Sequence, residues 1–128
     1  MKKIIRLKVY LAITIIVILS CTGCHINNNN ADISISETPE TYQLNASFSK
    51  GKTGKVRAYL DRSLNSNAGM SFANAEIDAT ITVDNATKFY VKSYPGILKI
   101  KFNKKENSEE ALAKIKNTCE GLKTVINE

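Results

Sequence analysis

Hydrophobic and polar residues alternate over much of the chain beyond Thr41, with the period of two that is typical of half-buried antiparallel strands. Three segments show this pattern at residues 42–48, 56–60 and 75–83, and two more follow at 88–92 and 97–102. The residues expected to face inward include Tyr42, Leu44, Phe48, Val56, Leu60, Ile77, Ile81, Phe89, Val91, Leu98, Ile100 and Phe102. The pattern therefore predicts five strands.

The expected register brings the apolar residues of the last three strands onto one face. A three-residue hairpin loop after the third strand sets Ile81 opposite Phe89, so that inward residues meet inward partners. A type II turn with Pro and Gly at residues 95–96 then pairs Val91 with Ile100. These two hairpins predict one continuous apolar face.

The C-terminal segment changes to a helical period. Its apolar stripe has spacings of three and four residues and consists of Leu112, Ile115, Cys119, Leu122 and Ile126. Asn107 and Glu110 form a candidate capping box, and Gly121 is expected to permit a close approach of the helix to the sheet. The predicted fold class is α+β, an antiparallel β-meander of about five strands with one C-terminal amphipathic helix packed on one face.

The first twenty residues have the layout of an export signal. Basic residues up to Lys8 precede an uncharged apolar run at residues 9–19, about half the length that a membrane-spanning helix needs. The following Ser20-Cys21-Thr22-Gly23-Cys24 resembles the lipobox of bacterial lipoproteins, in which a small residue precedes an invariant cysteine. The resemblance implies a diacylglycerol group on the cysteine thiol, cleavage just before that cysteine, and membrane attachment through the lipid.

Two cysteines compete for the lipid. Cys21 follows the apolar run directly, whereas Cys24 has the better immediate neighbour in Gly23 but an atypical cysteine three positions ahead of it. We prefer Cys21 and keep Cys24 as the alternative. Neither cysteine is followed by the Asp that retains lipoproteins in the inner membrane. The resemblance therefore implies the cell envelope, on the periplasmic side of the outer membrane where the host has one.

Residues 25–40 contain four consecutive Asn and several Ser and Thr without a sustained apolar pattern, which predicts a flexible tether. The expected organisation is a signal peptide at 1–20, a lipidated N-terminus and Asn/Ser-rich tether at 21–40, and one small α+β domain at 41–128.

The charge of the chain argues against nucleic acid as a partner. Its 18 basic and 12 acidic residues give a net charge of +6, but four of the basic residues precede the apolar run that cleavage would remove. The mature chain is then close to neutral. We expect no nucleic-acid partner.

One segment nearly matches a phosphate-binding loop. Residues 46–53 read A-S-F-S-K-G-K-T and differ from G-x-x-x-x-G-K-[ST] only at Ala46. That loop binds phosphate where a strand leads into a helix, and the alternation at 56–60 predicts a strand instead. We therefore interpret residues 49–54 as a hairpin loop and expect no nucleotide.

The chain carries little material for catalysis. Its one histidine, His25, precedes the predicted domain, so we expect no metal site, no cofactor and no enzymatic activity. Asp78 falls opposite Lys92 in the expected register and is interpreted as a surface ion pair. Cys119 is interpreted as a buried thiol, with a disulfide to Cys24 as the alternative if Cys21 carries the lipid.

Two surface features are candidates for partner binding. Five residues project together from the outward face of the last two strands: Lys88, Tyr90, Lys92, Lys99 and Lys101. The loop at residues 65–74 is long and carries Met70 and Phe72, which either bind a partner or pack on the sheet edge. The leading hypothesis is a non-enzymatic, lipid-anchored envelope protein that binds a protein partner as an accessory or assembly lipoprotein. The alternatives are an inhibitor or immunity lipoprotein that captures a hydrolase or toxin, and a carrier of an apolar ligand.

Overall fold

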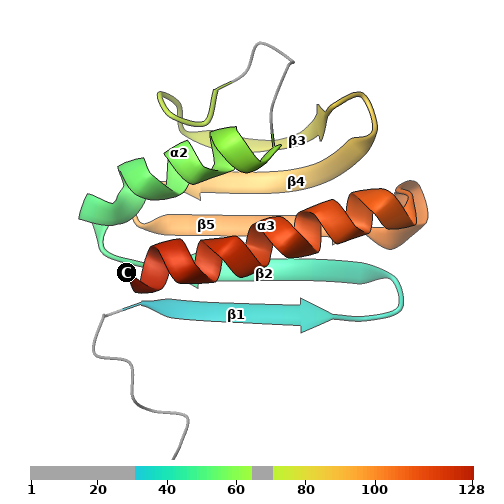
Figure 1. Ribbon diagram of the computed structural model, residues 1–128, viewed down its shortest axis with the longest axis horizontal. Helices are drawn as coiled ribbons and strands as arrows, with labels where there is room; N and C mark the ends of the chain where they lie inside the picture. The colour runs from blue at the N-terminus through green and yellow to red at the C-terminus, as the bar shows by residue number, and fades with distance from the viewer. Residues whose placement is uncertain (1–30, 65–70) are drawn as a thin grey trace, which may run out of the picture.

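The computed structural model describes residues 31–64 and 71–128, and these residues form a five-stranded antiparallel sheet with two α-helices on one of its faces (Figure 1). The elements in chain order are β1 (Asp32–Glu37), β2 (Thr41–Ser47), η2 (Lys50–Lys52), α2 (Thr53–Leu64), β3 (Ile77–Val83), β4 (Thr87–Tyr94), β5 (Ile97–Asn103), η3 (Lys104–Glu106) and α3 (Glu109–Asn127). The predicted α+β class, the antiparallel sheet and the C-terminal helix are confirmed.

The strands do not follow one another in a simple meander. Their spatial order is β1-β2-β5-β4-β3, so the chain leaves β2, crosses one face of the sheet as α2, and enters at the far edge as β3. Only β3, β4 and β5 form the expected meander, and β5 closes the sheet against β2. The helix α2 makes this crossing possible. A strand at residues 56–60 would instead have paired next to β2, and the strands would then have followed one another in sequence order.

The predicted hairpin register is confirmed. Ile81 lies opposite Phe89, and Val91 lies opposite Ile100. The three-residue turn between β3 and β4 begins with two left-handed residues, Asp84 at φ 54° and Asn85 at φ 56°. Short polar side chains of this kind tolerate the left-handed region better than other non-glycine residues.

The prediction of a strand at residues 56–60 is wrong, because this segment lies within α2. Val56, Leu60 and Leu64 are each at most 1% exposed and are spaced four residues apart, whereas Ala58 faces solvent. Five residues with apolar positions at their two ends and centre fit a strand as well as a helix. The longer i, i+4, i+8 series distinguishes the two and selects the helix.

The prediction of a flexible tether through Glu40 is wrong for residues 32–37, which form the edge strand β1. Ile33 and Ile35 lie opposite Ala46 and Leu44 and are half-buried against the core. Glu37 forms ion pairs with Lys104 at 2.8 Å and with Lys116 at 2.7 Å. The short Ile-Ser-Ile-Ser alternation was the signal, although the surrounding Asn and Ser residues obscured it.

The helix α3 covers the centre of the sheet with the predicted apolar stripe. Ile115, Cys119, Leu122 and Ile126 are fully buried, and Leu112 is half-buried at the margin. The N-cap is Ser108, whose hydroxyl accepts a hydrogen bond from the backbone N–H of Ala111 at 3.1 Å, and not Asn107 as expected. The side chain of Asn107 instead pairs with the backbone of Lys88, accepting from its N–H and donating to its carbonyl.

Gly121 provides a close approach between the two helices, and not between α3 and the sheet as expected. A Cβ atom at Gly121 would lie 1.7 Å from the hydroxyl oxygen of Tyr59 and 2.5 Å from its Cζ. Tyr59 projects from α2, so its ring crosses α3 at the one position that has no side chain. The missing side chain is what lets the helices pack at this point.

Candidate functional site

The face of the sheet opposite the helices is the main candidate site, because no element within residues 31–64 and 71–128 covers it. All five residues expected to project there do so: Lys88, Tyr90 and Lys92 from β4, and Lys99 and Lys101 from β5. We call these five residues the lysine face. The direct register pairs are Tyr90 with Lys101 and Lys92 with Lys99. The β4–β5 hairpin therefore gathers four ammonium groups on one flat surface.

Lys92 and Lys99 form a like-charge pair, and neither makes an ion pair within residues 31–64 and 71–128. Asp78 lies opposite Lys92 on its other side, as the register predicted. Its carboxylate, however, accepts a hydrogen bond of 2.6 Å from the hydroxyl of Tyr90, which raises the pKa of that tyrosine. The expected ion pair between Asp78 and Lys92 is absent from the described residues, which is a correction. Lys92 instead lies over the ring of Tyr94, 5.4 Å from its centroid.

The other end of the lysine face contains a small hollow of about 150 Å³. Its lining includes Lys88, Tyr90, Lys101 and Glu106. Lys88 has an exposed acidic neighbour in Glu106 at 3.8 Å, whereas Lys101 has no ionic partner in the described part of the chain. The hollow therefore offers one uncompensated ammonium group, that of Lys101, which suits a carboxylate or another small anionic group, whereas the proton of the Tyr90 hydroxyl is already donated to Asp78.

The β1–β2 half of the same face is polar and uncharged at its centre. Ser34 lies opposite Asn45 and Ser36 opposite Gln43. Hydroxyl and amide groups of this kind both donate and accept hydrogen bonds. The open face thus joins a basic half to a hydrogen-bonding half, and the acidic Asp78 stands at its β3 edge.

The second predicted surface, the loop at residues 65–74, is only partly within the described residues. Met70 lies outside them. Phe72 is fully buried, and its backbone N–H donates a hydrogen bond of 2.6 Å to Asp61. The hydroxyl of Ser71 donates to the same carboxylate at 2.9 Å. Phe72 is therefore a core residue fastened to α2, and its assignment as a partner-binding residue is corrected.

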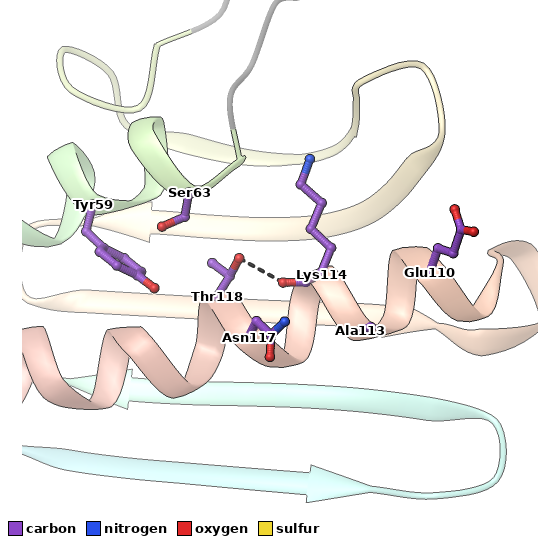
Figure 2. Close-up of a pocket in the computed structure, with 7 residues that line it drawn as sticks. All are labelled: Tyr59, Ser63, Glu110, Ala113, Lys114, Asn117 and Thr118. Carbon is purple, nitrogen blue, oxygen red and sulfur yellow. Dashed lines mark hydrogen bonds between the residues drawn. The ribbon is translucent and has the colours of Figure 1, made fainter.

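Sequence reasoning missed a groove between the two helices, because it placed a strand where α2 lies. The groove has a volume of about 560 Å³ and is lined by Tyr59 and Ser63 of α2 and by Glu110, Ala113, Lys114, Asn117 and Thr118 of α3 (Figure 2). Two of its polar groups are already engaged: the Thr118 hydroxyl donates to the carbonyl of Lys114, and the Lys114 ammonium pairs with Asp84. The groove is open to solvent, and the carboxylate of Glu110 is the charged group of its lining without an ion pair in the described residues.

The phosphate-loop resemblance has a different explanation from the one expected. A helix does follow the loop, so the premise that residues 49–54 join two strands is wrong. The two residues that would contact a nucleotide are used by the fold. Lys52 donates a hydrogen bond of 2.7 Å to the carbonyl of Ile126 at the end of α3, and the Thr53 hydroxyl accepts one of 2.9 Å from the backbone N–H of Gly96.

Cys119 is a free, fully buried thiol, which agrees with the preferred interpretation. Burial raises its pKa to about 12 and also raises the pKa of the neighbouring Tyr42. The thiolate is the reactive form of cysteine, so this residue is a packing group and not a nucleophile. Its proposed disulfide partner, Cys24, lies outside the described residues.

The predictions for the N-terminus, including Cys21, Cys24 and His25, also lie outside the described residues. Among the helices of the described segments, none combines the length and the apolar character needed to cross a membrane. Residues 31–64 and 71–128 contain no cluster of three or more His, Cys, Asp or Glu side chains able to hold a metal ion.

The lysine face is therefore the candidate site with the most uncompensated charge. Comparison with protein-family models, with curated proteins and with solved structures finds no match to this chain.

Proposed function

We propose that the protein is a lipid-anchored, non-enzymatic envelope protein whose lysine face docks an acidic protein partner, as an accessory or assembly lipoprotein would. The observation that supports this proposal most directly is the cross-strand pair of Lys92 and Lys99 on the uncovered face. Like charges directly opposite each other in a sheet destabilise it. Carboxylates of a partner placed between these lysines would remove the repulsion, and this relief would add to the free energy of binding.

The shape of the surface supports a macromolecular partner. The lysine face lies on two adjacent central strands, β5 and β4, and its lysine side chains are exposed or half-buried. A flat sheet of this kind makes many separate contacts and does not enclose a small molecule. Basic groups on such a surface accelerate association with an acidic partner and determine its orientation.

The two alternative functions have less support. A carrier needs an internal cavity, but a contiguous cluster of buried side chains from both helices and all of β2 to β5 fills the space between the layers. An inhibitor needs a protruding loop, and of the loop at residues 65–74 the described part carries Phe72 inward. The docking proposal needs only the lysine face.

Crosslinking in intact membranes tests the proposal. Wild type, Lys92→Glu plus Lys101→Glu, and the matched control Lys105→Glu plus Lys123→Glu are crosslinked, purified and analysed for copurifying proteins at low and high salt. Both double variants change the net charge equally, and the control lysines lie outside the lysine face in exposed pairs with Glu40 and Glu120. We expect the first variant alone to lose a partner that high salt also releases from wild type.

Unchanged recovery of the same partner by both double variants would refute docking at the lysine face. Equal loss from both would show that net charge matters and the particular surface does not. Circular dichroism of each variant checks that the fold is retained, as expected for exposed lysines.

A further inference from the structure

The end of the domain where β1 begins carries a second distinctive surface. Register pairs place Asp32, Ser47, Ile97 and Tyr94 in one row across four strands. The β4–β5 turn and the C-terminus lie at the same end, whereas the β3–β4 turn lies at the opposite one (Figure 1). The chain from residue 31 backward toward the cysteines therefore enters the domain at the end that carries the β4–β5 turn.

This end of the domain exposes one large apolar residue, Ile97, on the otherwise polar face of the sheet. Ile97 is 46% exposed and is the large exposed hydrophobic residue of the described segments. It stands at the outward position of β5, where the alternation otherwise puts lysines. Pro95 beside it is also exposed, and Tyr94 is half-buried under the ammonium of Lys92. Isoleucine and tyrosine next to lysine form a combination that suits the interface between lipid headgroups and acyl chains.

Three lysines lie at or near this end of the domain. The stem of Lys50 lies against the β4–β5 turn, since a Cβ atom at Gly96 would be 3.4 Å from the Lys50 Cγ. Lys92 and Lys99 form the next outward-facing pair of the sheet, two residues further along β4 and β5. Acidic groups are also present at this end: Asp32 lies in the row three strands away from Tyr94, Glu76 precedes β3 at the register position of Tyr94, and the chain ends there at Glu128. We call Lys50, Tyr94, Pro95 and Ile97 the anchor-side patch.

The corrected fold brings this patch close to the proposed anchor. Because β1 already begins at Asp32, ten residues separate it from Cys21. Whatever their conformation, ten residues span at most about 35 Å. If Cys21 carries the lipid, the anchor-side end therefore lies within about 35 Å of the bilayer surface, which is less than the longer tether at residues 21–40 would permit and allows contact with the headgroups.

We infer that the anchor-side patch rests on anionic phospholipid headgroups, with Ile97 inserted at the interface and Lys50 paired with phosphate. The inference rests on the lipid anchor of the proposed function. In this orientation the sheet stands up from the bilayer, with the hollow at Lys88 and Lys101 at its far end. The lysine face stays accessible to a protein partner.

A single tryptophan reporter tests the contact, because the chain contains no tryptophan. Full-length protein carrying Ile97→Trp is reconstituted into vesicles of phosphatidylcholine alone or mixed with phosphatidylglycerol, with brominated acyl chains as the quencher. The matched control reporter is Ala86→Trp, at an exposed position of the β3–β4 turn at the opposite end. We expect a blue shift and quenching for the first reporter only, stronger in the anionic vesicles and weakened by salt.

A charge variant adds a second arm. Lys50→Ala in the Ile97→Trp background should lower the ratio of quenched to unquenched reporter in anionic vesicles about fivefold, the contribution of one lysine near an anionic surface. Lys105→Ala, on the opposite end, should leave the ratio unchanged. Equal quenching of both reporters, or identical quenching in neutral and anionic vesicles, would overturn the inference.

The outcomes separate this inference from the proposed function. Palmitate incorporation and partner capture are measured on the same chains. An unquenched Ile97→Trp reporter on a palmitate-labelled chain that still captures its partner refutes the lipid contact alone. A quenched reporter without partner capture refutes the docking proposal alone, and a chain without palmitate refutes the anchor on which both depend.

Discussion

The contact between Tyr59 and Gly121 predicts that Gly121→Ala destabilises the domain when residue 59 is tyrosine and stabilises it when residue 59 is alanine. Gly121→Ala should by itself stabilise α3 by about 1 kcal/mol, because alanine favours the helix interior over glycine. The added Cβ atom would however lie 1.7 Å from the Tyr59 hydroxyl oxygen, 2.5 Å from Cζ and 3.1 Å from Cε2. All three distances are shorter than van der Waals contact, so the ring must leave its position between the helices.

The net cost follows from the two opposing contributions. Overpacking of this kind costs about 1–3 kcal/mol, and the half-buried ring also loses part of its apolar contact. We expect Gly121→Ala to destabilise the domain by about 1–2 kcal/mol in the wild-type background. In a Tyr59→Ala background the same substitution should stabilise by about 1 kcal/mol. The coupling energy between the two positions is then about 2–3 kcal/mol.

Urea unfolding followed by circular dichroism measures all four members of the cycle, and thermal melts should differ by about 4–8 °C per kcal/mol in a domain of this size. Gly54→Ala is the matched control, because nothing lies within 4 Å of its Cβ position in α2. It should be neutral or stabilising in both backgrounds. If Gly121→Ala stabilises both backgrounds equally, Tyr59 does not occupy the space beside Gly121 and the two helices do not pack through this contact.

Three further predictions concern the surface and the anchor. Lys99→Glu places a negative charge opposite Lys92 and should raise the stability of the isolated protein by about 0.2–1 kcal/mol in urea melts. The same variant should lose partner capture. Lower stability of the variant would contradict the repulsion between the two lysines. Cys21→Ser should abolish metabolic palmitate labelling and Cys24→Ser should not, and the reverse result would transfer the lipid to Cys24. The ion pairs of Glu37 with two lysines hold its pKa below the ordinary 4.5, so the stability from this carboxylate is fully present above that value and is lost as the pH falls through the lowered pKa. Glu37→Gln should therefore flatten the dependence of the melting temperature on pH below 4.5, and an unchanged slope would show that these ion pairs do not contribute.

The sequence by itself determined the elements whose patterns are long. Five apolar positions at helical spacing specify α3, and the alternation of β3, β4 and β5 specifies their register, because a slip of one residue would turn Ile81 and Phe89 to solvent. The same parity placed the lysine face correctly, since outward positions of paired strands must share one side of the sheet. The sequence was sufficient for these elements because each pattern of apolar residues repeats several times along the helix or strand.

Short patterns were decided by the tertiary structure. The segment at 56–60 alone has the same alternation as a strand, and it is helical in the fold because Val56, Leu60 and Leu64 are buried together on one side of α2. The strand β1 exists because β2 offers it an edge and the core covers Ile33 and Ile35, neither of which the local sequence can supply. Phe72 is buried and Ile97 exposed for the same reason. Whether an isolated apolar residue finds a partner depends on what long-range packing places next to it, and in this fold α2 and the Asp61 carboxylate hold Phe72 inward while nothing in the described chain covers Ile97.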